Sequence, residues 1–436
     1  MDPISVALLG ILGMFVLIGL QIPIGISMAI AGVVGFGLLS GWTAAFSLVA
    51  SKGVGTLSSE DLAVIPLFLV MGSFANISGL AADIYRLAYA FVGHRKGGLA
   101  LATIGGCAGF GAVCGSSLAT AATMGRVALP EMLKRNYDAS LATGSIAAGG
   151  TLGMLIPPSV VMVIYAFLTE QFVITMFVAA IIPGIVAVLF HFIAISIVVR
   201  KNPAAGPAGD RTDWRGRWNA IRQSTGVIFM LLLVIGGIYG GVFTVNEAAA
   251  LGAAVAFAFT VWRGKLNLQS LLLVMRETAA NTAMIYVIII GASIFASFIS
   301  ITKMPPAVVD QISGLGLPPL AVIFALFILF LILGSIFDTI AAMVITLPFI
   351  FPLVTSLGYH PIWWGIILVM TIEVGMITPP IGMNVFVLHG VAGNIPLKTI
   401  FRGIFPFFYA DVVRIILVIL IPPLALWLPA LLGYKI

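Results

Sequence analysis

The sequence predicts an all-α, polytopic membrane protein, on the basis of its composition, its apolar runs and an internal repeat. Of the 436 residues, 61% are hydrophobic and 8% are charged, and the mean hydropathy is +1.19. Because soluble globular proteins carry about 25% charged residues, a water-soluble fold is excluded. The net charge of +6 comes from short basic clusters between apolar runs, which is typical of cytoplasmic loops and not of a nucleic-acid-binding surface.

The apolar runs are long enough to cross a lipid bilayer as helices, since a spanning helix needs about 20 predominantly apolar residues. An amphipathic stretch is expected at 83–96. We expect ten single crossings, at residues 4–20, 23–40, 62–80, 139–166, 172–199, 225–242, 248–262, 278–300, 362–389 and 403–427.

Two further apolar segments, 97–130 and 319–352, do not fit a single crossing. Each is 34 residues long, and a straight helix of that length would reach about 51 Å at 1.5 Å per residue. We predict that each is a re-entrant helical hairpin that turns back at the middle of the membrane. The turns are expected at the glycine-serine pairs near the two centres, Gly115-Ser116 and Gly334-Ser335.

Basic residues orient these segments, because cytoplasmic loops carry an excess of Lys and Arg. Arg95-Lys96 and Lys134-Arg135 flank the first hairpin, so its open end should face the cytoplasm. The second hairpin has only Lys303 nearby, so its open end should face outward. Threading the ten crossings through these assignments places both termini outside.

The two halves of the chain resemble each other in sequence. Residues 115–124 (GSSLATAATM) match residues 334–343 (GSIFDTIAAM) at five of ten positions, at an offset of 219. Residues 153–163 match residues 375–385 at five of eleven positions, at an offset of 222. A nearly constant offset indicates an internal repeat.

We therefore predict an inverted-topology repeat, with residues 1–200 and 224–436 as its halves and the basic stretch 201–223 as a cytoplasmic linker. Each half would hold three spans, a hairpin and two further, partly unwound spans, so the odd number of crossings turns the second half over. Secondary transporters use this construction and place their binding sites near the midplane, between discontinuous helices.

Glycines and hydroxyl side chains at the hairpin tips are suited to bind sodium ions. Glycine lets the backbone turn and approach a ligand, and broken helices leave carbonyls without partners at mid-depth. The alternative is that the hydroxyls bond to their own helices, but their presence at both tips favours sodium. The predicted ligands are Gly115, Ser116, Ser117, Thr120, Gly334, Ser335, Asp338 and Thr339.

Two proline pairs interrupt otherwise continuous apolar spans, Pro157-Pro158 and Pro379-Pro380. Each proline removes a donor and pushes the preceding residue out of helical geometry. One proline would suffice for a kink, so a repeated pair predicts a true break that frees carbonyls one turn earlier. We expect one sodium site per half, completed by Gly153, Ile156, Gly375 and Thr378.

Several polar side chains in the apolar segments are open to two interpretations. Asp338, which the 219-residue offset pairs with Ala119, is a sodium partner or a proton-binding group, because a lone carboxylate at mid-depth is costly. Asn384 contacts a substrate or caps a helix, and Lys303 attracts an anionic solute or extends toward the interface. Glu373 is a further polar candidate. Asp411 and Arg414, one turn apart, should form an internal ion pair.

The sequence contains neither a GxxxxGK[ST] phosphate loop nor an HExxH zinc motif. We therefore expect transport and not an enzymatic activity, with no organic cofactor.

These features resemble one known family. The twin hairpins, QIPIG at 21–25, PLFLVMG at 66–72, GMLIPPS at 153–159 and GMITPPIGMN at 375–384 are similar to the large membrane subunit of tripartite ATP-independent periplasmic (TRAP) transporters. The resemblance covers nearly the whole chain. It implies membership of the ion transporter superfamily and an elevator-type carrier, in which the hairpins move against a scaffold.

The resemblance further implies import of an organic acid, such as a dicarboxylate, a sugar acid or sialic acid, driven by a Na⁺ gradient across a bacterial inner membrane. A periplasmic binding protein would deliver the solute, and a small four-helix membrane subunit would accompany the chain. Two sodium ions are expected, one at each hairpin tip. The expected substrate contacts are Ser117, Ser159, Asn384 and Lys303.

Two other functions stay open at this stage. One is a stand-alone Na⁺- or H⁺-coupled symporter of the same superfamily, which would need no binding protein. The other is a membrane-embedded enzyme, although the sequence offers no nucleophile–base pair or metal cluster for one.

Overall fold

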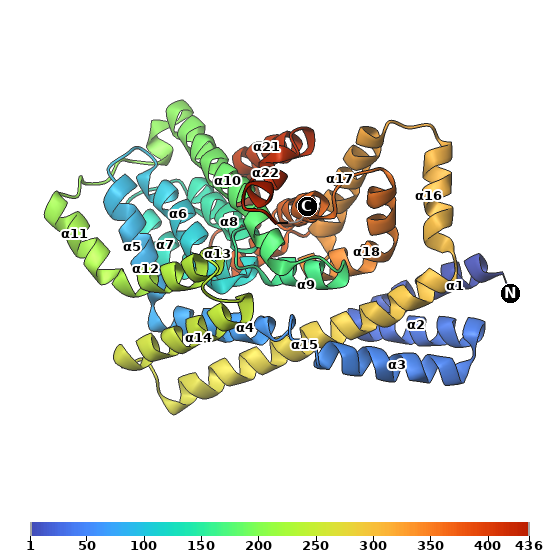
Figure 1. Ribbon diagram of the computed structural model, residues 1–436. Coiled ribbons are helices and arrows are strands. Elements are labelled where there is room, and N and C mark those ends of the chain that lie inside the picture. The colour runs from blue at the N-terminus through green and yellow to red at the C-terminus, as the bar shows by residue number, and fades with distance from the viewer. Residues whose placement is uncertain (1, 435–436) are drawn as a thin grey trace.

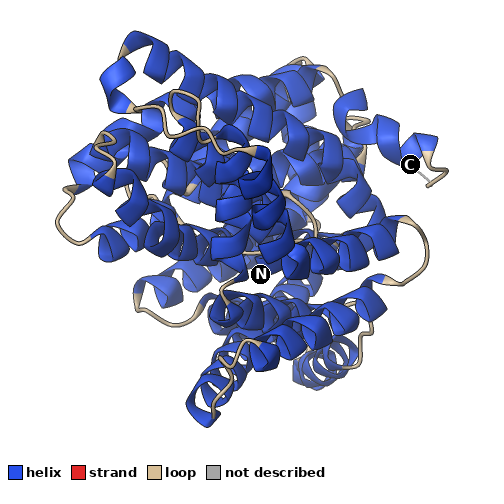
Figure 2. Cartoon of the chain, turned by 90° about the vertical axis from the view of Figure 1, so that its left-hand side faces the viewer, coloured by secondary structure: helices blue, strands red, loops and turns tan. Residues whose placement is uncertain are grey.

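The computed structural model describes residues 2–434, which form helices joined by short loops and contain no strand (Figure 2). The helices of the first part are α1 (Pro3–Gly19), α2 (Ile24–Ser40), α3 (Trp42–Leu57), α4 (Val64–Ser78), α5 (Leu80–Val92), α6 (Gly98–Cys114), α7 (Ser117–Lys134), α8 (Ala139–Leu155), α9 (Val160–Leu168) and α10 (Val173–Lys201). A 3₁₀ turn (Pro203–Ala205) follows.

The second part begins with α11 (Trp214–Gln223) and a helix with a central π-helical turn, formed by α12 (Thr225–Leu231), η2 (Leu232–Gly236) and α13 (Gly237–Tyr239). It continues with α14 (Val245–Trp262), α15 (Leu268–Ile301), α16 (Met304–Gly314), α17 (Pro319–Ile336), α18 (Thr339–Ser356), α19 (Pro361–Gly375), α20 (Met383–Ala392), α21 (Leu397–Leu420) and α22 (Pro423–Leu431).

Six helices in residues 2–434 are long and apolar enough to cross a membrane, namely α10, α14, α15, α17, α18 and α21. The number rises to nine if each of three bent helix pairs is one span. The helices α1, α2, α6, α19 and α20 are shorter but also apolar. The polytopic character is confirmed, and the exact number of crossings stays a prediction.

The helices form two layers (Figure 1). The long α15 runs along one side of the molecule with α1, α2, α3, α4 and α14, and most of the remaining helices lie above it. Small residues allow α15 to approach α2 closely: a Cβ added to Gly291 would lie 2.0 Å from the carbonyl oxygen of Gly25. Small residues serve the same purpose at helix interfaces in many membrane proteins.

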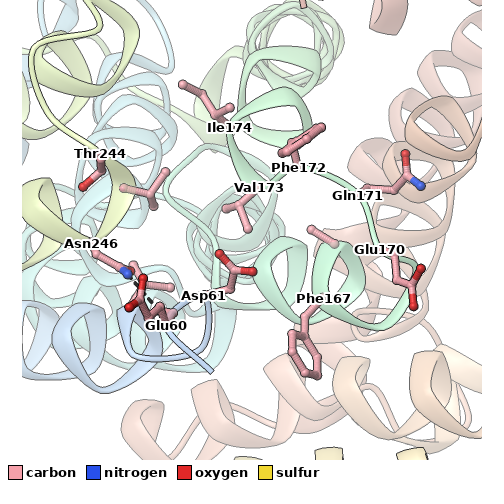
Figure 3. A pocket seen from close by; sticks show the side chains of 13 residues that line it. Glu60, Asp61, Phe167, Glu170, Gln171, Phe172, Val173, Ile174, Thr244 and Asn246 are labelled. Atoms are coloured by element: carbon pink, nitrogen blue, oxygen red, sulfur yellow. Dashed lines mark hydrogen bonds between the residues drawn. The ribbon is translucent and has the colours of Figure 1, made fainter. Parts of the chain in front are cut away.

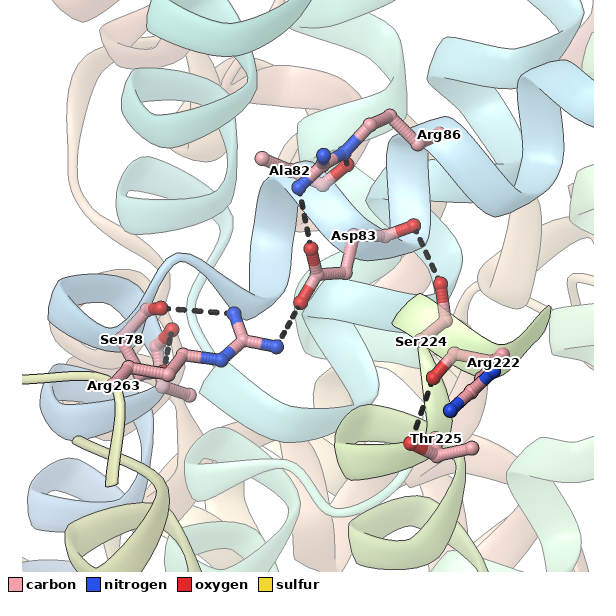
Figure 4. A network of polar contacts seen from close by, with 9 residues as sticks. Ser78, Ala82, Asp83, Arg86, Arg222, Ser224, Thr225 and Arg263 are labelled. Atoms are coloured by element: carbon pink, nitrogen blue, oxygen red, sulfur yellow. Dashed lines mark hydrogen bonds and ion pairs between the residues drawn. The ribbon is translucent and has the colours of Figure 1, made fainter. Parts of the chain in front are cut away.

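A polar cluster joins α5 to this layer (Figure 4). Asp83 is buried, and its Oδ1 accepts a 2.6 Å bond from Arg86 Nη2 while its Oδ2 pairs with Arg263 at the end of α14. Arg263 Nη1 also donates to the carbonyl of Ser78 at 3.0 Å, and Ser224 Oγ donates to the carbonyl of Asp83 at 3.0 Å. The cluster holds the 68° bend between α4 and α5 against α12 and α14.

Contacts between the two parts are reciprocal. Helix α2 packs on α15 as α14 packs on α4, and α7 packs on α20 as α18 packs on α9. Such crossed packing is expected of two related halves. The opposite orientation of these halves across a membrane stays a prediction.

The first predicted hairpin is present as α6 and α7. The backbone N–H of Leu99, near the start of α6, donates to Tyr137 just after α7 at 3.1 Å, and Thr103 Oγ1 lies 3.6 Å from Met132 Sδ. The two helices therefore run back alongside each other. Gly115 forms the turn with a φ of 64°, the left-handed region that glycine adopts at no steric cost.

The turn of the second hairpin is not where the sequence predicted it. Gly334 and Ser335 lie in the last turn of α17, and the break falls at Phe337-Asp338. The reason is packing: a Cβ on Gly334 would lie 2.5 Å from the carbonyl oxygen of Ile372 in α19. Gly334 is needed for contact between helices, and the turn uses extended backbone at Phe337.

Both proline pairs break their helices as predicted. Helix α8 ends before Pro157-Pro158, and α9 continues at an angle of 41°. Helix α19 ends before Pro379-Pro380, and α20 resumes at Met383. Nearly all residues of α8 and α19 are buried, and so is the first break at Pro157-Pro158, whereas the second break is exposed at Pro379-Pro380.

Four further helices did not stand out in the sequence as elements of their own, namely α3, α11, α16 and α22; the last follows a break at 421–422 in the predicted span 403–427. Helix α11 occupies the second half of the predicted linker 201–223 and packs on α5. Its Trp214 and Trp218 are exposed, and no residue of this helix is buried.

Candidate functional site

The first hairpin tip is packed against the α8–α9 break. Ser116 is the N-cap residue of α7, and its Oγ accepts a hydrogen bond from the N–H of Ala119 at 3.4 Å. Its carbonyl oxygen accepts a 2.7 Å bond from Thr120 Oγ1. A Cβ on Gly153 would lie 2.7 Å from Thr120 Oγ1 and 2.9 Å from the Ser116 oxygen. A Cβ on Gly115 would lie 3.1 Å from the carbonyl oxygen of Pro158. The structure thus brings these predicted residues together.

The prolines leave carbonyl groups of α8 without their usual helical donors. The N–H of Ile156 still bonds to the carbonyl of Leu152 at 2.9 Å. The next two carbonyls, of Gly153 and Met154, would need N–H groups at 157 and 158, which proline lacks. These oxygens are therefore available for a cation beside the tip. Ile156 can contribute only through its backbone, since its side chain lines an apolar cavity with Pro157.

Ser159 is fully buried just after the first break. Its Oγ accepts from the N–H of Met162 at 3.5 Å, which caps the start of α9. This bond favours a structural role for its hydroxyl.

The second tip is held by Asp338, the N-cap residue of α18. Its Oδ1 accepts from the N–H groups of Ile340 and Ala341, at 2.9 and 3.1 Å. The carbonyl of Ser335 accepts from the N–H groups of Ile381 and Gly382, at 3.3 and 3.2 Å. These bonds join the end of α17 to the loop that follows the second proline pair.

The second break satisfies several of its own groups. The carbonyl of Gly375 accepts from the N–H of Thr378 at 2.8 Å, and Thr378 Oγ1 donates to the carbonyl of Val374 at 2.6 Å. Ser335 Oγ likewise donates to the carbonyl of Ile332 at 2.7 Å. The hydroxyls of Thr378 and Ser335 therefore bond to their own helices, which was the alternative to sodium binding.

The offset of 219 used to align the two tips is wrong. Helices α7 and α18 begin at Ser117 and Thr339, 222 residues apart, so Asp338 takes the place of Ser116 and not that of Ala119. Gly334 corresponds in its packing to Gly111, whose Cβ would lie 2.4 Å from the Cα of Gly153.

The two tips meet around the side chain of Met376. Ser117 Oγ lies 3.7 Å from Met376 Sδ, and Thr339 Oγ1 lies 2.8 Å from the same sulfur. Thr339 Oγ1 also donates to Glu373 Oε1 at 2.8 Å, while the N–H of Asn384 donates to the carbonyl of Met376 at 3.1 Å. All five residues are buried. Met376 entered the sequence analysis only as part of the GMITPPIGMN segment and without a contact of its own, since methionine is common in apolar cores.

Lys303 is not part of this cluster. It is exposed, with a φ of 57°, at the corner between α15 and α16 near α1 (Figure 1). The structure does not bring it together with the hairpin tips, so the sequence interpretation as a side chain extending outward fits its position better.

A second buried ionic cluster joins α10 and α21. Asp411 Oδ1 accepts from His191 Nε2 at 2.8 Å and from Arg414 Nε at 2.5 Å, and the ring of His191 meets Phe407 edge to face. The pair of Asp411 and Arg414 was predicted. His191 was missed, because residues 220 positions apart share no pattern along the sequence.

A cavity of about 770 Å³ lies where the loops before α4, α10 and α14 meet (Figure 3). Glu60, Asp61 and Glu170 line it, and Asn246 Nδ2 donates to the carbonyl of Glu60 at 2.7 Å. This cavity contains none of the predicted sodium or substrate residues. Its acidic side chains would repel a carboxylate solute.

The family follows from a comparison of the sequence with known proteins. The profile described as "Tripartite ATP-independent periplasmic transporter, DctM component" matches residues 11–424. The chain belongs to this family. The DctM family is one of transporter permeases and not of enzymes, and membership confirms both the resemblance and the multi-pass membrane character.

Curated relatives of this DctM-family chain are named for different solutes. It is 37% identical over 388 residues to the C4-dicarboxylate TRAP transporter large permease protein DctM of Pseudomonas aeruginosa, covering 88% of this chain and 90% of the relative. It is 28% identical over 415 residues to the sialic acid TRAP transporter large permease protein SiaM of Vibrio cholerae, covering 94% and 96%.

A solved structure shares the fold. The YdaH transporter of Alcanivorax borkumensis, described as having an unusual topology, matches this DctM-family chain with a TM-score of 0.64 at 15% identity, over 87% of this chain and 88% of that one. At this identity the likeness concerns the fold alone.

Proposed function

We propose that this TRAP large permease imports an organic acid by coupling its movement to sodium ions bound at the two hairpin tips. A periplasmic binding protein would deliver the solute, and a small four-helix membrane subunit would complete the transporter in the inner membrane. The observation that carries the proposal is the contact between each tip and the proline break of its own half.

The first sodium site would use backbone oxygens between the tip and α8. The carbonyls of Gly153 and Met154 lack helical donors, and the carbonyl of Ser116 lies beside Gly153. Gly115 and Ser117 complete the tip. A dehydrated Na⁺ is satisfied by such oxygens, and unwound carbonyls coordinate Na⁺ in secondary transporters with broken helices.

The second site would lie between Gly334, Asp338 and the 375–378 turn. Helices α17 and α19 approach there without side chains between them, since a Cβ on Gly375 would lie 2.6 Å from the carbonyl carbon of Gly334. Asp338 keeps its Oδ2 free of the bonds that cap α18, so this oxygen can offset the charge of a nearby cation.

The hairpins and the broken helices would move as one body against the layer around α15. Their mutual contacts are extensive, as in α6 with α8 and α17 with α19. The layer of α2, α4, α14 and α15 would be the stationary scaffold, held by the polar cluster at Asp83. An elevator-type motion of this kind would carry solute and ions together.

Uptake by proteoliposomes tests the proposal. The chain is reconstituted with a TRAP small membrane subunit and a periplasmic binding protein, and uptake of a radiolabelled C4-dicarboxylate and of sialic acid is measured with and without an inward Na⁺ gradient. We expect uptake of one of these acids that requires the gradient and both partners. Uptake by the chain alone, or uptake that follows a proton gradient, would instead establish a stand-alone symporter.

Asp338→Asn separates the charge of this side chain from its structural role. Asparagine caps helices about as well as aspartate, so α18 should keep its start while the second site loses a negative charge. We expect the Na⁺ concentration for half-maximal uptake to rise about tenfold, equivalent to about 1.4 kcal/mol. The exposed Asp310→Asn on α16 is the matched control. An unchanged Na⁺ dependence in Asp338→Asn would remove this residue from the site.

A further inference from the structure

Glu373 differs from the other buried acids of the described residues in having no cationic partner. Asp83 pairs with Arg86 and Arg263, and Asp411 pairs with Arg414. Glu373 is 1% exposed, on α19, and forms no ion pair in residues 2–434. An ionised carboxylate in such a place is costly unless a cation accompanies it.

The surroundings of Glu373 contain oxygen atoms that lack partners. Thr339 Oγ1 donates a 2.8 Å hydrogen bond to Glu373 Oε1, but Glu373 Oε2 has no hydrogen-bond partner. Asn384 is fully buried, and neither its Oδ1 nor its Nδ2 has a partner. The backbone N–H of Asn384 bonds to the carbonyl of Met376, whose sulfur contacts both Thr339 and Ser117, so Asn384 lies next to this group of side chains.

This pattern is not that of an ordinary buried polar group. Leaving one buried polar group unpaired costs about 1–3 kcal/mol, and here three side-chain atoms of two residues are unpaired within one cluster. Asn384 does not act as a helix cap, the structural alternative from the sequence, because Gly382 precedes α20 and the Asn384 side chain accepts no backbone N–H. A bound cation would satisfy the carboxylate and the amide oxygen together.

We propose a third sodium site between the two tips, with the carboxylate of Glu373 as its charged ligand and the side-chain oxygen of Asn384 as a neutral one. Ser117 Oγ, buried on the opposite tip, is placed to complete it. The inference rests on the proposed sodium coupling, but it is distinct from the two sites of backbone oxygens. It assigns Asn384 to the ions and not to the solute.

The test counts sodium ions. Equilibrium binding of ²²Na⁺ to the purified chain in detergent is measured for wild type, Glu373→Gln, Asn384→Leu and the control Glu277→Gln, which removes an exposed carboxylate of the same size. Glu373→Gln keeps the shape of the side chain and its bond from Thr339. We expect it to bind one sodium ion fewer per chain than wild type, and Glu277→Gln to bind the same number as wild type.

Asn384→Leu should leave the number of bound ions unchanged at saturation and lower the affinity for one of them at least tenfold. Thermal unfolding without Na⁺ shows whether each variant folds like wild type. If wild type binds sodium and Glu373→Gln binds the same number with the same affinities, the third site is excluded and the proposed function stands. If wild type binds no sodium, the proposed function fails with it.

Discussion

Replacing Gly153 with alanine is expected to reduce sodium-dependent uptake at least a hundredfold. The new Cβ would lie 2.9 Å from the carbonyl oxygen of Ser116 and 2.7 Å from Thr120 Oγ1. The threonine side chain can rotate, but the Ser116 oxygen is backbone, so the hairpin tip must move away from α8. Such a shift separates the oxygens of the first sodium site, and misplacement by about 1 Å is enough to cost 10²-fold in a positioned site.

The measurement is initial uptake in proteoliposomes together with ²²Na⁺ binding. Gly390→Ala is a matched control on α20, because a Cβ there meets no atom within 4 Å and the helix should gain slightly in stability. If Gly153→Ala transports like wild type, the tip and the break do not form an ion site. A loss of folding is recognised by thermal unfolding without Na⁺.

Replacing Asp411 with alanine is expected to destabilise the protein by about 3–5 kcal/mol, the usual cost of leaving one member of a buried charge pair alone. Arg414 is 1% exposed and His191 is fully buried, so neither can reach water once Asp411 is removed. Arg414 Nη1 and His191 Nδ1 already lack partners. The junction of α10 and α21 should therefore open first on heating.

Thermal unfolding of the purified chain in detergent measures this loss. Asp310→Ala removes an exposed acid on α16 and should change stability by less than about 0.5 kcal/mol. A double change of Asp411→Leu with Arg414→Met should recover most of the loss, because it removes both charges. Equal stability of Asp411→Ala and wild type would mean that the cluster contributes nothing to the fold.

Much of the fold could be predicted because its signals are local. Composition identified the membrane class, the lengths of 97–130 and 319–352 identified two paired-helix segments, and consecutive prolines identified both breaks. Each signal depends on residues that are close in sequence. Helix α16 was not predicted, since its eleven residues include two prolines and one acid and are too few to span a membrane.

The candidate site was predicted in part, for a physical reason. The residues at the first tip follow from backbone rules for glycine and proline, and they do lie together. The turn of the second tip was misplaced because glycine serves two purposes, turning at Gly115 and close packing at Gly334. The contacts of Thr339 with Glu373 and Met376 bridge 34 and 37 residues and depend on tertiary packing.

The sulfur of Met376 contacts one hydroxyl from each hairpin tip. A shift of one hairpin tip on binding an ion would therefore be transmitted to the other tip through the flexible side chain of Met376. Thermodynamic reciprocity then requires that an ion at one tip change the affinity of the other tip by the same factor as in the reverse direction. Sodium should consequently activate this permease with a Hill coefficient above one, and a shorter side chain at this position should bring that coefficient toward unity.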